Sequence, residues 1–391
     1  MTPARTYPAR RDDVRLLVVD PAASSWFGTT TRALPGLLAP GDLLVVNDAA
    51  TLPASLTGRD EAGRPVEARL ISTDQDRGTS CFWVVLFGAG DWRTRTEDRT
   101  APAVLHVGAR LAFGALAAEV AAVSALSPRL VSLRFAGSMD EVWAGLFREG
   151  RPVQYSYLAH ELPLWAVQTV YSSRPWAFEM PSAGRPLSWA LLLALRRRGV
   201  RWASLTHAAG LSSTGDPTLD AALPLPERFD IPSSTVDAIE ETRRAGARVV
   251  AVGTTVVRAL EGAAAPSGVL ASGTGVTDLR IGPQHRLRVV DGILSGTHAA
   301  GESHFALLGA FAPAPLLASA VAYAEADGFT THELGDAMLV LPRVTATDAG
   351  SQGRSEKSTS RGLQGRPVGR PSAAPRQNFR LSTAFWALPT S

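Results

Sequence analysis

Short apolar runs that end in polar residues recur along the chain and predict buried strands. Residues 14–20 read Val-Arg-Leu-Leu-Val-Val-Asp, and residues 43–47 read Leu-Leu-Val-Val-Asn after a Pro-Gly-Asp turn. Further strands are expected at 200–206 and 248–252. Helices are expected at 138–150, 187–198, 233–245, 255–262 and 313–327. This order of strands and helices indicates a mixed α/β fold.

The pattern changes between about residue 56 and residue 136, where helical periodicity nearly disappears. The strand candidates there are residues 66–72, 81–87, 104–107, 110–113, 118–125 and 130–135. Short strands at hairpin spacing are typical of a small antiparallel barrel or sandwich. We therefore expect a β-barrel domain at 58–151, inserted into an α/β domain made of 1–57 and 152–342. A disordered basic tail is expected at 343–391.

Length and composition exclude several classes of protein. The 391 residues, 45% of them hydrophobic, suffice for two domains with a sizeable core. No apolar run reaches the roughly 18 residues that a membrane span needs, and the first residues do not resemble a secretory signal. Cys81 is the single cysteine, and its apolar neighbours predict a buried side chain. We expect a cytoplasmic protein without a membrane partner.

The formal net charge of +3 suggests a nucleic-acid partner, but the distribution of the charges weakens that interpretation. Eight basic and two acidic residues lie beyond residue 342, which leaves 31 basic against 34 acidic residues before it. Binding to a nucleic-acid backbone depends on Lys and Arg. The acidic excess of residues 1–342 therefore argues against a tRNA partner, although arginine clusters such as Arg196-Arg197-Arg198 could provide a surface for one.

Generic catalytic signatures are absent from the sequence. It contains no phosphate-binding loop of the Gly-x-x-x-x-Gly-Lys type, no Gly-x-Gly-x-x-Gly motif after a strand and no Gly-x-Ser-x-Gly elbow. His298 and His304 are six residues apart, so they would not share a helix face as a metal pair. We expect no metal site.

Junctions between strands and turns carry the candidate chemistry instead. An apolar run leads through Gly253-Thr254-Thr255 into a helix. Such a turn lets the backbone approach a ligand, and the helix N-terminus offers unpaired N–H groups to a carboxylate or phosphate. Alternatively, Thr254 or Thr255 only caps the helix. Arg258 and Glu261, which share one helix face, are either a site pair or an ordinary surface pair.

Four further junctions contain candidate residues of the same polar or small types. They are residues 180–188 with Pro181, Ser182 and Gly184, residues 206–214 with His207 and Gly210, residues 291–303 with His298, and residues 332–340 with Asp336. A histidine at a strand end can exchange protons near neutral pH, but it can equally be a structural residue.

Taken in order, these segments resemble one family, the S-adenosylmethionine:tRNA ribosyltransferase-isomerases of queuosine biosynthesis. The resemblance covers about residues 11–341 and consists of several motifs in register. They are Pro40–Asp48 with Leu52-Pro53-Ala54, Gln168-Thr169-Val170-Tyr171, Ala251–Glu261, Thr277-Asp278, His298 and Gly335–Leu339.

The resemblance implies an α/β barrel-like domain with an inserted β-barrel. It also implies a transferase and isomerase that moves the ribosyl part of S-adenosylmethionine onto the aminomethyl-deazaguanine base (preQ1) of a tRNA. The ribosyl part becomes an epoxycyclopentanediol, which gives epoxyqueuosine-tRNA, and adenine and methionine are released. S-adenosylmethionine is then a co-substrate, and no metal is implied.

The resemblance and the residue types together assign roles to the candidate residues. The Gly253 turn and Arg258 would hold a ligand such as the methionine carboxylate. Acid/base or hydroxyl-binding roles fall to His207, His298 and Asp336, and Glu227 and Glu261 would place negative charge near the sulfonium. The other substrate-binding candidates are Pro181, Ser182, Gly184, Gly210, Thr254, Thr255 and Asp278.

Several positions depart from the family's pattern. Pro186 replaces a histidine, Ala50 replaces an arginine, and the segment 223–227 keeps Glu227 but no histidine. These losses leave two alternatives open. The chain could be a paralogue that uses S-adenosylmethionine with a small-molecule acceptor, or cleaves it without tRNA. It could also be a non-catalytic ligand-binding or degenerate homologue. A monomer or small homo-oligomer is expected.

Overall fold

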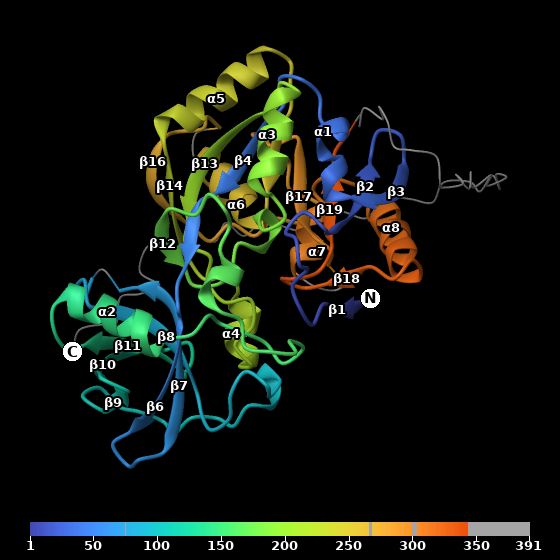
Figure 1. The fold of residues 1–391 in the computed structure, drawn as a ribbon. Helices are drawn as coiled ribbons and strands as arrows, with labels where there is room; N and C mark the ends of the chain where they lie inside the picture. Colours follow the sequence, from blue (N-terminus) through green and yellow to red (C-terminus); the bar gives the residue numbers. More distant parts are fainter. Residues whose placement is uncertain (75, 266–267, 299–302, 343–391) are drawn as a thin grey trace, which may run out of the picture. The chain divides into compact units, whose positions relative to one another are not determined.

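The computed structural model describes residues 1–74, 76–265, 268–298 and 303–342 (Figure 1). The tail predicted at 343–391 lies outside these residues. None of the helices described is both long and apolar enough to cross a membrane. The short elements are β1 (Thr2–Pro3) paired with β18 (Thr330–Thr331), β5 (Ala49–Thr51) paired with β12 (Arg174–Ala177), and α4 (Pro217–Ala222).

A nine-stranded mixed sheet forms the centre of the α/β part, in the order β16-β14-β13-β4-β15-β17-β19-β2-β3 (Figure 1). Its strands are β2 (Arg15–Asp20), β3 (Ser25–Thr30), β4 (Leu43–Asn47), β13 (Arg201–His207), β14 (Glu227–Ile231), β15 (Val249–Val252), β16 (Gly273–Thr277), β17 (Gly292–Gly296) and β19 (Ala337–Val340). The strands predicted from apolar runs correspond to β2, β4, β13 and β15, which confirms the α/β class.

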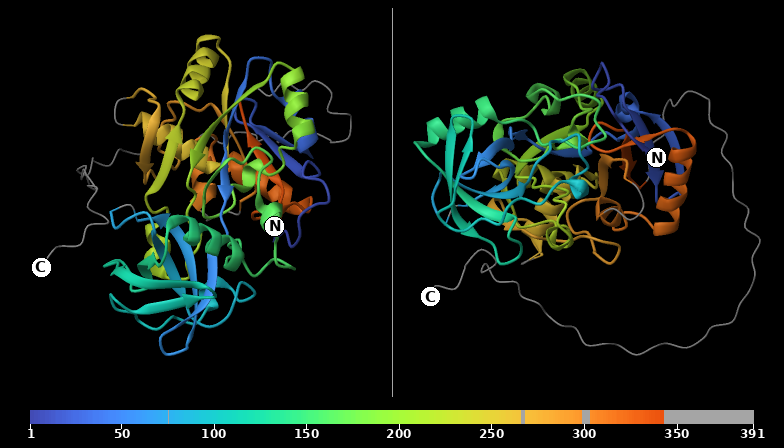
Figure 2. Two further views of the ribbon diagram at one scale, coloured as in Figure 1. Left: turned by 60° about the vertical axis from the view of Figure 1, so that its left-hand side comes forward. Right: turned by 90° about the horizontal axis from the view of Figure 1, so that it is seen from below.

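Helices cover both faces of this sheet (Figure 2). Side chains alternate between the faces along a strand, so Leu43 and Val45 pack on one side while Leu44 and Val46 pack on the other. The first face is covered by α5 (Ser233–Arg244), α6 (Thr254–Ala264), α7 (Ser303–Leu308) and α8 (Ala314–Ala326), and the second by α1 (Leu34–Leu37) and α3 (Trp189–Arg197). Burial on both faces explains why β4 is apolar without alternation.

Six antiparallel strands close into a barrel in the order β10-β11-β8-β7-β6-β9, as predicted from the hairpin spacing. They are β6 (Ser55–Asp60), β7 (Pro65–Thr73), β8 (Cys81–Phe87), β9 (Arg110–Phe113), β10 (Leu116–Val123) and β11 (Leu130–Phe135). The helix α2 (Met139–Glu149) contributes Val142 and Leu146 to the barrel core. Cys81 is buried, as expected. The domain limits at 57/58 and 151/152 stay a prediction.

One predicted barrel strand is wrong and one was missed. Residues 104–107 form no strand, and Val104 and Val107 are 78% and 60% exposed, because no neighbouring strand pairs with this segment. β6 lacks an apolar run, yet it closes the barrel. A Cβ atom at Gly58 would lie 2.1 Å from the Ala112 carbonyl oxygen, so only glycine lets β6 approach β9 this closely.

A buried ion pair joins the N-terminal ends of β4 and β15. Asp42, which is 1% exposed, accepts hydrogen bonds from the Arg248 side chain and from the backbone N–H groups of Ala39 and Arg248. The Arg248 guanidinium also donates to the Pro342 carbonyl oxygen at 2.8 Å, beyond the end of β19. This pair therefore fixes three strands relative to one another.

We expect Asp42→Ala to lower the free energy of unfolding by about 3–5 kcal/mol, because it leaves a largely buried guanidinium without its counter-charge. Urea denaturation measures the change. The matched control is Glu241→Ala, which breaks the exposed Arg201–Glu241 pair and should cost less than about 1 kcal/mol. Equal effects of the two substitutions would contradict the assigned role of Asp42.

Candidate functional site

The C-terminal ends of the parallel strands β4, β13, β15 and β17 meet at one edge of the nine-stranded sheet. The antiparallel strands β14 and β19 begin at the same edge, since β14 pairs with β13 and β19 with β17. In open α/β sheets, ligands bind outside the carboxyl ends of parallel strands. The junctions that the sequence singled out are thus brought together at the edge where a ligand is expected.

Asn47 fixes the end of β13 at this edge. Its side-chain amide donates to the His207 carbonyl oxygen at 3.0 Å and accepts the His207 backbone N–H at 2.9 Å. The same oxygen accepts the Ala49 N–H at 3.1 Å. Asn47 belonged to the first family motif but was not predicted as a site residue. Its role depends on β4 and β13 being neighbours, which the sequence does not show.

Three charged or polar side chains from different elements meet beside the hydrogen bonds between Asn47 and His207. The His207 ring, at the end of β13, is fully buried, and its Nε2 lies 3.4 Å from Oε2 of Glu227 on β14. Arg258 of α6 donates to the same oxygen from Nε at 3.1 Å and from Nη2. The Gly210 N–H donates to the other carboxylate oxygen at 2.9 Å. The predicted residues His207, Gly210, Glu227 and Arg258 thus form one cluster.

Burial determines the charge state of His207. It lowers the pKa of His207 to about 4, and this effect outweighs the neighbouring Glu227 carboxylate, which raises it. Burial alone would raise the pKa of the Glu227 carboxyl. Arg258, His207 and the Gly210 N–H together outweigh this effect and hold that pKa below its usual value. Near pH 7, Glu227 is therefore ionised and His207 neutral. Neither ring nitrogen has a hydrogen-bond partner within the described part of the chain.

The turn at Gly253 leaves the N-terminus of α6 open. Gly253 is the N-cap residue with a φ of +95°, a conformation that favours glycine, and no side chain caps the helix. The alternative in which Thr254 or Thr255 caps α6 is therefore wrong. The N–H groups of Thr254, Thr255 and Val256 bind no acceptor among the described residues. Such groups attract a carboxylate or phosphate.

The loop with Pro181, Ser182 and Gly184 lies directly against this turn. A Cβ atom at Gly253 would be 3.4 Å from that of Ala183, which follows Ser182 in a short 3₁₀ helix. A Cβ atom at Gly184 would be 2.0 Å from the buried Tyr171 hydroxyl, so glycine is required there. The two small-residue turns therefore form one backbone surface.

Two predicted site residues have carboxylates that are occupied by backbone groups. Glu261 accepts N–H groups of the consecutive residues 288, 289 and 290, at 2.9–3.2 Å. Asp336 accepts the N–H groups of Arg15 and Thr330 and the Thr330 hydroxyl, at 2.8–3.0 Å. Arg258 and Glu261 do not bind each other, because Arg258 binds Glu227 and Glu261 binds backbone groups. Glu261 is 1% exposed, so the alternative of an ordinary surface pair is wrong.

His298 and Asp278 lie at the same sheet edge but follow other strands, β17 and β16. The His298 Nε2 is 3.1 Å from the Ser295 hydroxyl, and its ring stacks on His304 with 4.8 Å between centroids. Asp278 is exposed directly after β16, whose last residue Thr277 pairs with Glu227. No group of three His, Cys, Asp or Glu side chains in the described ranges could hold a metal ion.

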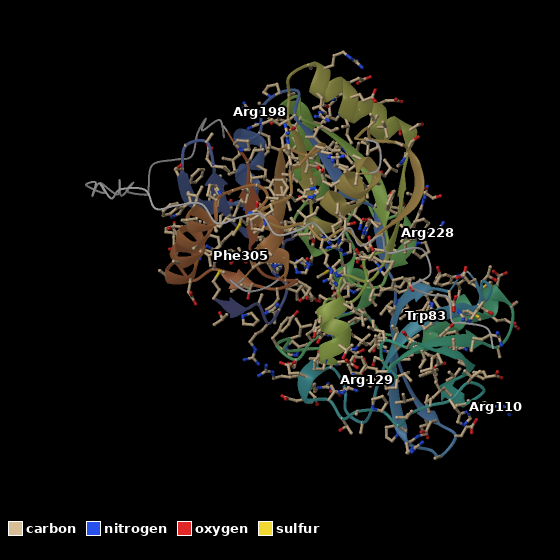
Figure 3. All side chains as sticks on the ribbon, turned by 180° about the vertical axis from the view of Figure 1, so that it is seen from behind. Trp83, Arg110, Arg129, Arg198, Arg228 and Phe305 are labelled. Carbon is tan, nitrogen blue, oxygen red and sulfur yellow. The ribbon has the colours of Figure 1, made fainter. Side chains whose placement is uncertain are left out.

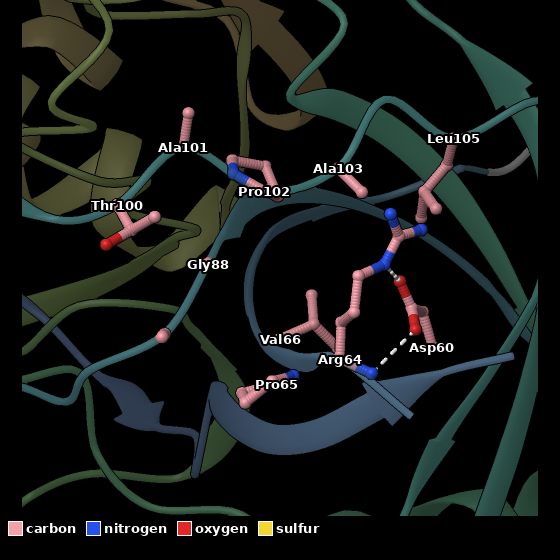
Figure 4. A pocket seen from close by; sticks show the side chains of 11 residues that line it. Asp60, Arg64, Pro65, Val66, Gly88, Thr100, Ala101, Pro102, Ala103 and Leu105 are labelled. Atoms are coloured by element: carbon pink, nitrogen blue, oxygen red, sulfur yellow. Dashed lines mark hydrogen bonds and ion pairs between the residues drawn. The ribbon is translucent and has the colours of Figure 1, made fainter. Parts of the chain in front are cut away.

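A cavity of about 180 Å³ lies at the surface of the barrel, beside the loop at 100–105, and involves none of the predicted site residues (Figure 4). Its walls are residues 60, 64–66, 88–89, 100–103 and 105. The charged side chains among them, Asp60 and Arg64, bind each other at 2.7 Å. The candidate chemistry therefore lies at the sheet edge and not in this cavity.

Comparisons with known proteins decide the family. A family model described as "Queuosine biosynthesis protein" matches residues 2–340. The chain belongs to this family. It is 37% identical over 340 residues to the S-adenosylmethionine:tRNA ribosyltransferase-isomerase of Gloeobacter violaceus, which covers 85% of this chain and 90% of the relative.

Other relatives carry the same name. The protein from Synechococcus elongatus is 35% identical over 344 residues, covering 85% of this chain and 90% of its own. The protein from Trichlorobacter lovleyi is 34% identical over 343 residues, covering 86% and 95%. A solved S-adenosylmethionine tRNA ribosyltransferase from Thermotoga maritima is 23% identical with a TM-score of 0.47, covering 87% of this chain and 96% of its own.

We expect the fully buried His207 to destabilise the protein as the pH falls from about 6.5 to about 4. In that window the unfolded chain binds a proton on this side chain and the folded chain does not, so lower pH favours unfolding. The separation of the two pKa values corresponds to ~3 kcal/mol at pH 4. Urea unfolding at pH 7 and pH 4.5 tests this, because His207→Asn should lose less stability between the two than the wild type. Equal losses would show that His207 titrates normally.

Proposed function

We propose that this chain is an S-adenosylmethionine:tRNA ribosyltransferase-isomerase, the activity that its relatives are named for. The proposal rests on one observation at the site. The uncapped N-terminus of α6 lies one helical turn from the Arg258–Glu227–His207 cluster. Both features lie at the carboxyl ends of the parallel strands, where α/β sheets bind ligands.

This arrangement suits the two charges of S-adenosylmethionine. Its methionine part ends in a carboxylate, which the free N–H groups of Thr254 and Thr255 and the positive end of the helix dipole would bind. Its sulfonium carries a positive charge, which the ionised Glu227 carboxylate would stabilise. Arg258 keeps that carboxylate ionised in a buried place, so we assign it a positioning role.

His207 is the group we propose for proton transfer. Protons on a carbon bound to a sulfonium are acidic, and a neutral imidazole can accept one. The Glu227 carboxylate, 3.4 Å away, would stabilise the imidazolium that results. His298, Asp278 and the loop at 181–184 would line the same region, whereas Glu261 and Asp336 would support it through the backbone groups that they bind.

The small acidic excess of residues 1–342 does not by itself oppose a tRNA substrate, because phosphate contacts depend on where exposed arginines lie and not on the net charge. Ion pairs in the interior remove equal numbers of acidic and basic side chains from the surface. Asp42, Glu67 and Glu227 each bind a buried or nearly buried arginine. Exposed arginines remain, among them Arg196 and Arg197 at the end of α3. A tRNA substrate would also place the protein in the cytoplasm. The division into an α/β domain and a barrel domain at 58–151 is part of the same proposal.

The activity assay uses S-adenosylmethionine and preQ1-modified tRNA. We expect release of adenine and methionine, and an epoxyqueuosine adduct on the tRNA detected by mass spectrometry of its nucleosides. Arg258→Ala should lower kcat/KM about 100-fold or more, since it leaves Glu227 without its counter-charge. Arg201→Ala, in an exposed ion pair at the other end of β13, is the matched control and should change it little.

Two outcomes would replace this proposal by an alternative. Adenine release in the absence of tRNA would favour the paralogue that uses a small-molecule acceptor or cleaves S-adenosylmethionine alone. No adenine release, together with no heat of S-adenosylmethionine binding in calorimetry, would favour the non-catalytic homologue.

A further inference from the structure

Three aromatic rings stack on one another next to the candidate site. The rings of Tyr155 and Tyr157 are 6.1 Å apart between centroids at 18°, and those of Tyr157 and His332 are 4.5 Å apart at 15°. The three side chains are partly exposed. His332 has a φ of +68°, which is uncommon for a residue with a side chain. The stack joins segments that are about 175 residues apart in the sequence.

Hydrogen bonds connect this stack to the Glu227 cluster. The Tyr155 hydroxyl binds the Glu179 carboxylate and lies 3.2 Å from the Ser212 hydroxyl. The Glu179 N–H donates to the Ala209 carbonyl oxygen at 3.3 Å, and the next residue, Gly210, donates its N–H to Glu227. The stack therefore lies beside the loop that holds Glu227.

Polar groups without partners surround the rings. Glu333 is partly exposed, its carboxylate is hydrogen-bonded only to its own backbone N–H among the described residues, and desolvation raises the pKa of that carboxyl to about 7. The Tyr157 hydroxyl is buried without a partner. Arg69, which is 1% exposed, lies 5.7 Å from the Tyr155 ring, and its Nη1 is unpartnered. Buried polar groups are normally hydrogen-bonded, so the Tyr157 hydroxyl and Arg69 Nη1 point to a missing ligand.

We propose that the Tyr155–Tyr157–His332 stack and Glu333 form the subsite for the acceptor base. This base is a guanine-type heterocycle that is flipped out from between its neighbouring bases in an RNA. Proteins that act on a nucleobase place it against aromatic side chains and bind its exposed edge. A guanine-type edge offers two adjacent N–H donors, and the two oxygens of one carboxylate can accept both. The inference rests on the proposed function, whose acceptor is a guanine derivative in tRNA.

The same hydrogen-bonding pattern disfavours adenine. Its edge has a ring-nitrogen acceptor where guanine has an N–H donor, so one carboxylate oxygen would face a lone pair. A site built to bind donors discriminates strongly against a ligand that lacks them, because its polar groups are then left unpaired. Glu179, held by Tyr155 and Ser212, would act as a positioning residue for the Tyr155 ring.

Binding of RNA to the full-length protein tests this subsite without requiring turnover. Fluorescence anisotropy gives Kd values for preQ1-modified tRNA and for the same tRNA with adenosine at that position. We expect the wild type to prefer the preQ1 tRNA by about 10- to 100-fold. Glu333→Gln, which is isosteric but offers a single acceptor oxygen, should reduce the preference to about threefold or less. The exposed Glu240→Gln is the control and should keep it.

Calorimetry with S-adenosylmethionine alone separates the two possible partners of Glu333. Unchanged affinity in Glu333→Gln supports a base-binding role, whereas lost affinity with retained tRNA preference would assign Glu333 to S-adenosylmethionine and overturn the inference. Retained preference for preQ1 tRNA in Glu333→Gln would also overturn it, even where adenine is released normally. A wild type that discriminates between the tRNAs but releases no adenine would overturn the proposed function and support the subsite.

Discussion

The pairing of β4 with β13 and β15, closed by Asn47 at its end, is the constraint on which the site depends. β4 lies between the two strands that carry His207 and the Gly253 turn, so it sets the distance between them. Asn47 then binds both backbone groups of His207. With the strand end fixed, the buried ring lies 3.4 Å from Glu227. The ion pair of Asp42 and Arg248 secures the other end of β4 and β15.

The distribution of ion pairs separates structural carboxylates from candidate functional ones. On the outer face of barrel strand β7, opposite the core residues Val66 and Ala68, Glu67 binds both Arg69 and Arg99, and these charges are neutralised where they are buried. At the barrel surface, Arg129 bridges to the α/β part by donating to the carbonyl oxygens of residues 214 and 215 at 3.0 Å (Figure 3). Glu179 and Glu333 have no arginine partner within the described ranges. A partly buried carboxyl without a counter-charge destabilises the folded state. A role in ligand binding is a physical reason for the presence of these two carboxyls.

Much of the architecture could be predicted because its signals are local. The apolar runs of β2, β4 and β15 and the Gly253 turn are visible in a few consecutive residues, and so is the antiparallel spacing of the barrel strands. The segment 104–107 shows the limit of this reasoning. Its valines favour a strand, but a strand also needs a neighbour to pair with. β6, in turn, has a neighbour in β9 without having an apolar run.

The sequence by itself determined the family, the α/β class with its barrel, and the set of junctions that carry polar residues. Only the tertiary structure decided which of those residues work together. Glu261 and Asp336 looked equivalent to Glu227, yet their carboxylates bind backbone N–H groups. Tyr155 and His332 carried no signal of their own, although His332 and Glu333 opened one of the junctions. The reason is that strand order and register bring these side chains together, and neither can be read from residues that are neighbours in the chain.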